Sequence, residues 1–151
     1  MGSRSRIDLP PAYLLLSLAA MGVFHVAFPL ARPIEEPYRY AGIVIAALGV
    51  ALDAWALALF LKARTGIIPF SEATAFVVRG PYRWTRNPMY LGMTAILLGF
   101  ALYLGSVTPF IVIPAFMGLI GERFIAPEEE MLEKTFGQAY VDYKARVRRW
   151  L

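Results

Sequence analysis

Long uncharged stretches alternate with short polar ones along this chain. Asp, Glu, Lys and Arg are absent from residues 9–31 and 87–121, and Asp53 alone interrupts residues 40–61. A helix rises about 1.5 Å per residue and the hydrocarbon slab of a membrane is about 30 Å thick, so uncharged stretches of this length indicate membrane-spanning helices. The pattern therefore predicts an all-α integral membrane protein.

The first two spans are predicted over residues 11–30 and 38–61, and the short turn-rich loop between them makes the two helices antiparallel neighbours. As one helix, residues 87–121 would be about 52 Å long, which exceeds the slab. We expect the Gly-Ser-Val-Thr-Pro sequence at 105–109 to break this stretch. The result is a tight helical hairpin, the third and fourth of four spans, over residues 88–104 and 109–125.

The tail predicts an amphipathic helix over residues 127–150, because its apolar residues recur every three or four positions. Helix capping explains three acids at the start of this helix, where the helix dipole favours negative charge; alternatively, these acids face the arginines before the third span across one pocket. Such a helix lies on the membrane or on the protein. The stripe consists of Leu132, Phe136, Tyr140, Tyr143, Val147 and Leu151, and the acids are Glu128, Glu129 and Glu130.

Basic residues gather on one side of this topology. The amino terminus, the 62–88 segment and the tail hold most of the Lys and Arg residues, while the loop after the first span holds only Arg32 and Arg39. The positive-inside rule therefore puts both termini and the 62–88 segment in the cytoplasm, in a membrane of the bacterial inner-membrane type. We attribute the net charge of +4 to the membrane topology and to contact with anionic membrane lipids, not to nucleic-acid binding.

The amino-acid composition excludes several kinds of metal site and catalytic site. The chain of 151 residues is 58% hydrophobic and 17% charged, with a mean hydropathy of +0.55. It has no cysteine and His25 is its only histidine, so we expect no thiolate or multi-histidine metal site and no Ser-His-Asp triad. Neither a dinucleotide-binding nor a P-loop glycine pattern occurs.

The 62–88 segment is interrupted by prolines and glycines, so we expect irregular backbone with free polar groups. It ends in a run from Arg79 to Tyr90 with three arginines and three aromatic residues at the start of the third span. A helix amino terminus beside arginines favours an anionic group. A juxtamembrane belt of basic and aromatic residues is the alternative interpretation.

Two motifs resemble those of the isoprenylcysteine carboxyl methyltransferase and phospholipid methyltransferase family of membrane enzymes. The first reads Gly80-Pro-Tyr82 followed by Arg86-Asn87-Pro88-Met-Tyr90. The second reads Glu128-Glu129, Leu132, Phe136-Gly137, Tyr140, Tyr143 and a basic end at 146–149. The resemblance covers about residues 65–150. Asn87 replaces the histidine commonest in the family and cannot titrate near neutral pH, so no proton transfer is implied there.

The resemblance implies an S-adenosylmethionine-dependent methyltransferase acting at the cytoplasmic membrane face, with the loop at 62–88 as the cofactor loop of a single domain. Arg86 or Arg123 would bind the cofactor carboxylate, and Glu128 or Glu129 its ammonium or ribose hydroxyls. Tyr82 and Tyr90 would supply aromatic walls, and the backbone at Asn87 and Pro88 would close the pocket.

By the same resemblance, a lipophilic acceptor enters sideways from the bilayer. Methyl transfer needs its nucleophile in line with the methyl–sulfur bond, about 3 to 3.5 Å away. Arg123 and Glu129 are the candidate catalytic residues, which would orient this acceptor or adjust its charge. A phospholipid amine, an isoprenylcysteine-type carboxylate and a small lipophilic thiol or amine all remain possible acceptors.

Inside the spans, Asp53 is a candidate functional acid. A hydrogen bond to another helix, to a tyrosine or to His25, is the favoured interpretation of Asp53, and His25 is likewise expected to bridge helices. The alanine-rich second span provides a close-packing face for another helix or for a second protomer, which makes a homodimer possible.

Other function classes remain. A sterol-reductase-type membrane reductase would use a nicotinamide cofactor, but those enzymes have many more preceding spans. A non-enzymatic membrane adaptor would need no cofactor pocket, so binding of S-adenosylmethionine discriminates against it. A transporter is not favoured, because no paired broken helices are evident.

Overall fold

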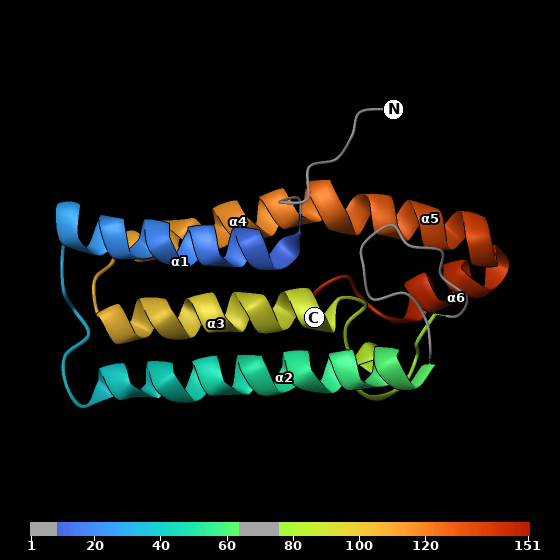
Figure 1. Ribbon diagram of the computed structural model, residues 1–151, viewed down its shortest axis with the longest axis horizontal. Coiled ribbons are helices and arrows are strands. Elements are labelled where there is room, and N and C mark those ends of the chain that lie inside the picture. Colours follow the sequence, from blue (N-terminus) through green and yellow to red (C-terminus); the bar gives the residue numbers. More distant parts are fainter. Residues whose placement is uncertain (1–8, 64–75) are drawn as a thin grey trace.

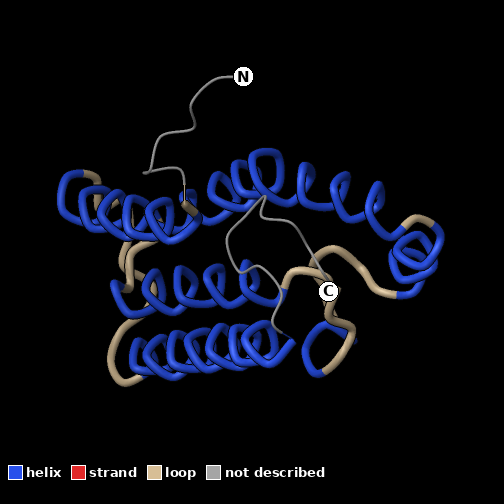
Figure 2. Tube along the Cα trace, turned by 45° about the vertical axis from the view of Figure 1, so that its right-hand side comes forward, coloured by secondary structure: helices blue, strands red, loops and turns tan. Residues whose placement is uncertain are grey.

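A computed structural model describes residues 9–63 and 76–151 of the chain, and these residues fold as helices joined by short turns. Figure 1 shows α3 in the middle of the bundle, with α2 on one side and α1 and α4 on the other. The turned view in Figure 2 keeps this order and shows α5 and α6 extending beyond one end of the bundle. The part of the expected cofactor loop at 64–75 lies outside the described residues.

The helices begin and end where the local sequence requires it. Pro10 and Pro88 occupy first-turn positions, where a missing N–H is tolerated. Gly105 ends α3 in the left-handed conformation, with φ +77°, which glycine adopts without a steric penalty. The expected break between the third and fourth apolar stretches is therefore confirmed. The elements up to this break are α1 (Pro10–Ala27), η1 (Tyr38–Tyr40), α2 (Ala41–Ala63), η2 (Gly80–Arg83) and α3 (Pro88–Leu104).

Beyond the break, the helix does not stop where the sequence predicts. A 3-10 turn, an α-helix, a π-helical turn and a second α-helix follow one another without interruption from Thr108 to Phe136. Pro127 has no N–H, and its ring would clash with the carbonyl four residues before it, so the wider π turn just before it accommodates the proline. These elements are η3 (Thr108–Ile111), α4 (Val112–Ile120), η4 (Gly121–Ile125) and α5 (Ala126–Phe136).

This continuity corrects two predictions. The acids at 128–130 do not open a free helix amino terminus, because Ile125 before α5 already has helical dihedral angles. The helix expected over 127–150 is two helices, α5 and α6 (Gln138–Arg146), separated by Gly137 with φ +55°. A positive φ is strained for other residues, so this glycine ends the helix in the middle of the predicted apolar stripe.

Three helices among the described residues are long and apolar enough to cross a membrane: Pro10–Ala27, Tyr38–Ala63 and Thr108–Phe136. The fourth apolar helix, α3, has 17 residues and is shorter. The bounds of α3 coincide with the predicted third stretch. The fold is therefore an all-helical one with the composition of an integral membrane protein.

Helices α2 and α3 pack through small residues. A Cβ on Gly42 would collide with the carbonyl oxygen of Gly99, and one on Gly49 would lie 2.6 Å from that of Gly92. Since glycine lets two backbones approach closely, these positions bring the helices together. The predicted close-packing face of the second span is partly confirmed, because buried Ala56 belongs to it while most of the neighbouring alanines are exposed.

The two ends of the bundle differ in chemistry. At one end, the turns after α1 and α3 are joined by hydrogen bonds from Val107 to Ala31 and from Ile34 to Gly105. His25 Nδ1 and Ser106 Oγ share a 2.7 Å hydrogen bond there, which confirms the interpretation of His25 as a bridge between elements. The opposite end carries η2, α5, α6 and the chain's last residues, and holds most of the remaining polar contacts.

Candidate functional site

The candidate site lies where η2, the start of α3, α5 and the C-terminal residues meet. Aromatic contacts hold η2 on α2: the rings of Trp55 and Trp84 are 5.9 Å apart, and those of Phe60 and Tyr82 are 5.5 Å apart. Gly80 turns the chain here with φ +58°. These contacts explain the aromatic residues of the first motif as packing groups that fix η2 beside the first turn of α3.

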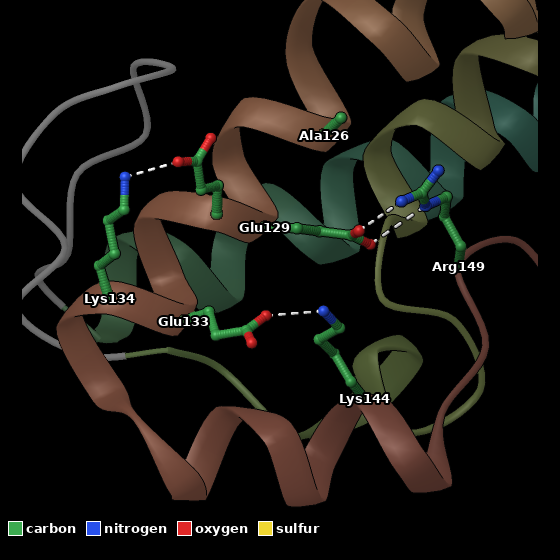
Figure 3. Close-up of a pocket in the computed structure, with 7 residues that line it drawn as sticks. Ala126, Glu129, Glu133, Lys134, Lys144 and Arg149 are labelled. Atoms are coloured by element: carbon green, nitrogen blue, oxygen red, sulfur yellow. Dashed lines mark hydrogen bonds and ion pairs between the residues drawn. The ribbon is translucent and has the colours of Figure 1, made fainter.

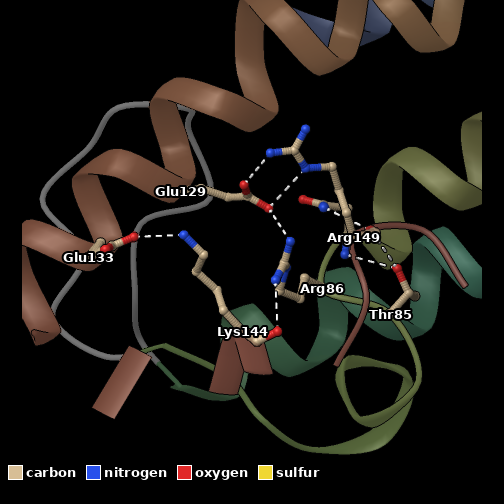
Figure 4. Close-up of polar contacts among 7 residues, drawn as sticks. Thr85, Arg86, Glu129, Glu133, Lys144 and Arg149 are labelled. Atoms are coloured by element: carbon tan, nitrogen blue, oxygen red, sulfur yellow. Dashed lines mark hydrogen bonds and ion pairs between the residues drawn. The ribbon is translucent and has the colours of Figure 1, made fainter. Parts of the chain in front are cut away.

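Glu129 is the centre of an ionic cluster, which we define as Arg86, Glu129 and Arg149. Arg86 Nη2 lies 2.9 Å from Glu129 Oε1, and Arg149 donates from Nε to the same oxygen at 3.2 Å. Arg149 Nη2 binds the other carboxylate oxygen at 2.5 Å. Figure 4 shows the two guanidinium groups converging on this one carboxylate from different segments. The side chains of Arg86 and Glu129 are 11% and 8% exposed, so their ion pair forms largely out of water, whereas the Arg149 side chain is 43% exposed.

The chain's last residues form one wall of the site. We call residues 147–151 the C-terminal strap. Thr85 Oγ1 and Asn87 Nδ2 both donate to the carbonyl oxygen of Arg149, at 3.0 and 2.9 Å, and the backbone N–H of Arg86 donates to the carbonyl of Arg148 at 2.9 Å. Trp150 packs against the apolar core. Three consecutive residues, Thr85 and the first two of the Arg-Asn-Pro sequence, therefore hold the strap, so Asn87 acts here as a donor to the backbone.

The ionic cluster carries one more positive than negative charge, since two guanidinium groups share one carboxylate. Arg86 Nη1 also donates to the carbonyl of Lys144 at 3.2 Å, while its buried Nε has no hydrogen-bond partner among the described residues. An unpaired buried N–H is costly unless an acceptor is supplied. The cluster can therefore bind an anionic group such as a carboxylate.

A pocket of about 350 Å³ opens beside this cluster, and its size lies within the range of small-molecule sites. Figure 3 shows Glu129 and Arg149 on one side of the pocket, with Glu133 and Lys144 paired across it. The Nζ–Oε2 distance of that pair is 2.7 Å. The lining combines both signs of charge on α5, α6 and the strap: Ala126, Glu129, Glu130, Glu133, Lys134, Lys144 and Arg149.

A second group of polar residues lies on another side of α5, and we call it the phenol–acid cluster: Tyr82, Tyr90 and Glu128. The Tyr90 hydroxyl donates to Glu128 Oε1 at 3.0 Å. Burial is the main cause that raises the pKa of Tyr82, and the negative charge of Glu128 adds to it. The Tyr82 phenol is therefore neutral at any physiological pH.

Tyr143 connects α6 to the first motif, because its hydroxyl donates to the carbonyl of Tyr82 at 2.7 Å. Burial raises the pKa of Tyr143 to about 12. Phe76 contacts the ring of Tyr143 and those of Tyr140 and Phe136. The tyrosines of the second motif thus fasten α6 against the segment before η2.

The predicted site residues fall into three places. Arg86, Asn87 and Glu129 meet at the strap, and Tyr82, Tyr90 and Glu128 form the phenol–acid cluster. Pro88 is buried as the first residue of α3. The guanidinium carbon of Arg123 lies 5.9 Å from the centre of the Tyr13 ring in α1, and Tyr13 belongs to neither cluster. The role of Arg123 beside Glu129 stays a prediction.

The sequence reasoning missed Thr85 and Arg149. Thr85 is buried and lies directly before the Arg-Asn-Pro motif, and Arg149 belongs to a basic run that we interpreted as topology. The signal was present in the order of the motifs, since the second one ends in this basic run. The ion pair of Arg149 with Glu129, 20 residues earlier in the chain, is visible only in the fold.

The hydrogen bond predicted for Asp53 is not found at its buried oxygen, and it stays a prediction for the rest of the carboxyl group. The Oδ1 atom of Asp53 is buried without a hydrogen-bond partner, so among the described residues neither a tyrosine nor His25 binds this oxygen. The carboxyl group of Asp53 packs against Gly92 of α3. A residue with a Cβ would collide with this carboxyl group, so only glycine fits at position 92.

Taken together, apolar helices long enough for a bilayer and a charged pocket at one end of their bundle indicate an integral membrane protein. The family model for phospholipid methyltransferases matches residues 37–139, more than half of the chain. The chain therefore belongs to the phospholipid methyltransferase family, which confirms the resemblance of its two motifs. Membership indicates a membrane methyltransferase.

The chain is also similar to an uncharacterized protein of Haemophilus influenzae. The two are 43% identical over 63 residues, which is 42% of this chain and 100% of that protein. No solved structure matches the chain.

Proposed function

We propose that this protein transfers the methyl group of S-adenosylmethionine to a lipophilic acceptor at the cytoplasmic face of the membrane, by in-line displacement. The observation that carries the proposal is the ionic cluster with its surplus positive charge beside a pocket of about 350 Å³. Family membership indicates methyl transfer, and methyltransferases of this kind generally use S-adenosylmethionine.

The residues present fit the chemistry of this cofactor. Its carboxylate matches the surplus charge of Arg86 and Arg149, and the unpartnered Nε of Arg86 is a donor in need of an acceptor. Its ammonium and ribose hydroxyls match the carboxylates of Glu129 and Glu133 that face the pocket. When bound, S-adenosylmethionine supplies an electrophilic methyl group on a sulfonium.

The chain's own residues have separate tasks in this proposal. Arg86 and Arg149 bind negative charge, and Glu129 holds the two guanidinium groups in place. Thr85 and Asn87 fix the strap that carries Arg149. The strap and α6 exclude water from one side of the pocket. The phenol–acid cluster offers donors and an acceptor to the group that receives the methyl.

The topology belongs to the proposal as well. Four spans, with α3 as the central one, would leave η2, α5, α6 and both termini in the cytoplasm, as the distribution of Lys and Arg predicts. The carboxyl-terminal helices would then lie at the membrane surface, and the acceptor would enter from the bilayer. A homodimer stays a prediction.

Calorimetry with purified protein in detergent tests cofactor binding. We expect wild type to bind S-adenosylmethionine or its demethylated product, and Arg86→Ala, Glu129→Ala and Arg149→Met to weaken binding about tenfold or more. Arg146→Met is the matched control, because Arg146 is exposed and bonds only within α6, to the carbonyl of Asp142. No binding to wild type at millimolar ligand would overturn the proposal.

Topology and the acceptor need their own experiments. Tags at both termini should be inaccessible from outside intact cells, and labelling of either from outside contradicts the four-span arrangement. Incubation of lipid extracts with the methyl-labelled cofactor, followed by identification of the labelled product, would reveal the acceptor. An absence of labelled lipid from every extract would count against a lipophilic acceptor.

A further inference from the structure

The pocket beside the ionic cluster has an ion pair of its own. Lys144 Nζ of α6 lies 2.7 Å from Glu133 Oε2 of α5, and both residues line the pocket. Figure 3 shows this bond spanning the space between the two helices. Among the described residues it is the one ion pair that joins α5 to α6. The protein thus places an ammonium group of its own on a carboxylate of the pocket.

The three acids that line the pocket differ in how firmly they are held. Glu129 has both oxygens bound by guanidinium groups, and Glu130 pairs with Lys134 of the same helix at the exposed surface. Glu133 is 44% exposed, and Lys144 is its one side-chain partner within residues 9–63 and 76–151. An ammonium group is a point charge on a flexible stem, so it leaves a carboxylate more easily than a forked guanidinium group does. Glu133 is therefore the acid of this pocket that can exchange its cation.

Glu133 also lies next to the place where the ionic cluster binds negative charge. Glu129 and Glu133 are four residues apart on α5, so their side chains are neighbours on one face of the helix. The backbone carbonyl of Lys144 accepts a hydrogen bond from Arg86 Nη1, which anchors Lys144 beside the same cluster. In an amino acid the carboxylate and the ammonium are attached to one carbon atom. A carboxylate bound at the guanidinium groups therefore keeps its ammonium within reach of the neighbouring acid.

We infer that Lys144 is an internal competitor of the cofactor, whose ammonium group holds Glu133 until the ammonium of S-adenosylmethionine displaces it. The inference rests on the proposed function, since it concerns the affinity of the same site. Binding then exchanges one ion pair for another, which lowers the affinity for the cofactor. Removal of the Lys144 charge should consequently tighten binding, although Lys144 lines the pocket, and this gain should depend on Glu133.

Calorimetry with two ligands tests the inference on the full chain in detergent. S-adenosylmethionine carries the ammonium, whereas methylthioadenosine shares its adenosine and sulfur but lacks the amino-acid part. We expect Lys144→Met to bind S-adenosylmethionine about threefold more tightly than wild type does, and to bind methylthioadenosine equally well. Lys134→Met is the matched control. It removes the same charge from the lining of the same pocket, but its partner is Glu130, so both affinities should stay near those of wild type.

A double-mutant cycle separates competition from a general effect of charge. If the two ammonium groups compete for Glu133, Lys144→Met gives its threefold gain only where Glu133 is present and gives none in Glu133→Gln. An equal gain in both backgrounds would show that Lys144 repels the cofactor without competing for this acid, and would overturn the inference. Unchanged or weaker binding of S-adenosylmethionine in Lys144→Met would overturn it as well.

Thermal unfolding without ligand separates competition from folding. Lys144→Met and Glu133→Gln break the same half-exposed bond, so each should lower the Tm slightly and by a similar amount. A merely structural role of this bond would lower the Tm without any gain in affinity, which contradicts the inference. If wild type binds no S-adenosylmethionine, the proposed function fails, and the inference fails with it. If wild type binds it and Lys144→Met brings no gain, the inference alone is overturned.

Discussion

Glu128 and Glu129 are neighbours in the chain, yet they belong to different chemical environments. Glu129 is buried between two guanidinium groups of η2–α3 and the strap. Glu128 accepts a hydrogen bond from Tyr90 and has no ion-pair partner among the described residues. Successive residues of a helix point about 100° apart, so one helix can serve two sites at once.

In the proposed function, this difference gives the two clusters separate roles at the candidate site. The ionic cluster is positively charged and faces the charged pocket, which suits a carboxylate-bearing cofactor. The phenol–acid cluster has no ion-pair partner among the described residues, and in our proposal it offers hydrogen bonds to the acceptor. The two acids are adjacent in the motif, but their side chains lie on different sides of α5.

Of the substitutions in these two clusters, replacement of Glu129 should have the largest effect on the free energy of unfolding. Glu129→Gln leaves Arg86 and Arg149 side by side without their carboxylate, so we expect a loss of about 3 kcal/mol in the free energy of unfolding. Denaturant unfolding in detergent measures the loss. Glu130→Gln is the control: its pair with Lys134 is exposed on both sides, and its removal should change nothing measurable. Equal effects of the two substitutions would contradict the central place of Glu129.

The close packing of α2 on α3 depends on Gly92. In Gly92→Ala the new methyl group would meet the carboxyl group of Asp53, and it would lie 2.8 Å from the carbonyl oxygen of Gly49. We expect a destabilisation of about 2 kcal/mol from overpacking, measured in the same unfolding assay. Gly118→Ala in α4 has no atom within 4 Å of the new methyl group, so it should be neutral or slightly stabilising. The prediction fails if the two glycines tolerate alanine equally.

Tyr90→Phe removes only the hydroxyl that binds Glu128. If this hydrogen bond positions Glu128 for the acceptor, the rate of methyl transfer should fall about tenfold, while the affinity for S-adenosylmethionine stays near that of wild type. Tyr103→Phe is a matched control near the opposite end of α3 and should leave the rate unchanged. A parallel loss of cofactor affinity in Tyr90→Phe would mean that the two clusters are one site.

Asn87 should show the smallest effect. Asn87→Ala removes one donor to the carbonyl of Arg149, while Thr85 still binds the same oxygen, so we expect the affinity for S-adenosylmethionine to fall about fivefold. Asn87→His should restore it, because an imidazole N–H can also donate to a carbonyl. Calorimetry on the three proteins tests this order. Loss of affinity in Asn87→His would show that the amide itself is needed.

The positions of the helices could largely be predicted from the sequence, because they depend on local properties. Uncharged length, first-turn prolines and Gly105 predicted α3 to its exact bounds and the break that follows it. The two motifs indicated the family, and the family match confirms it; which of their residues carry the chemistry stays a prediction. His25 could be interpreted correctly because a lone histidine in an apolar stretch needs a polar neighbour.

The errors have physical reasons that lie outside local pattern. The helix over 127–150 was wrong because Gly137 interrupts a periodicity that continues beyond it, and the capping role of the acids was wrong because the π turn joins α4 to α5. A period in the sequence does not reveal whether the backbone turns. Only the neighbours of a segment decide whether it continues.

By itself, the sequence determined that this is an apolar helical protein with its chemistry gathered in two motifs of the phospholipid methyltransferase family. Only the tertiary structure decided that the strap closes over the first motif, that Glu128 and Glu129 separate, and that Asp53 lies against Gly92. The reason is distance along the chain: Thr85 and Arg149 are separated by 64 residues. Such contacts depend on how whole helices pack, and helix packing is set by small residues and side-chain shapes that no local pattern describes.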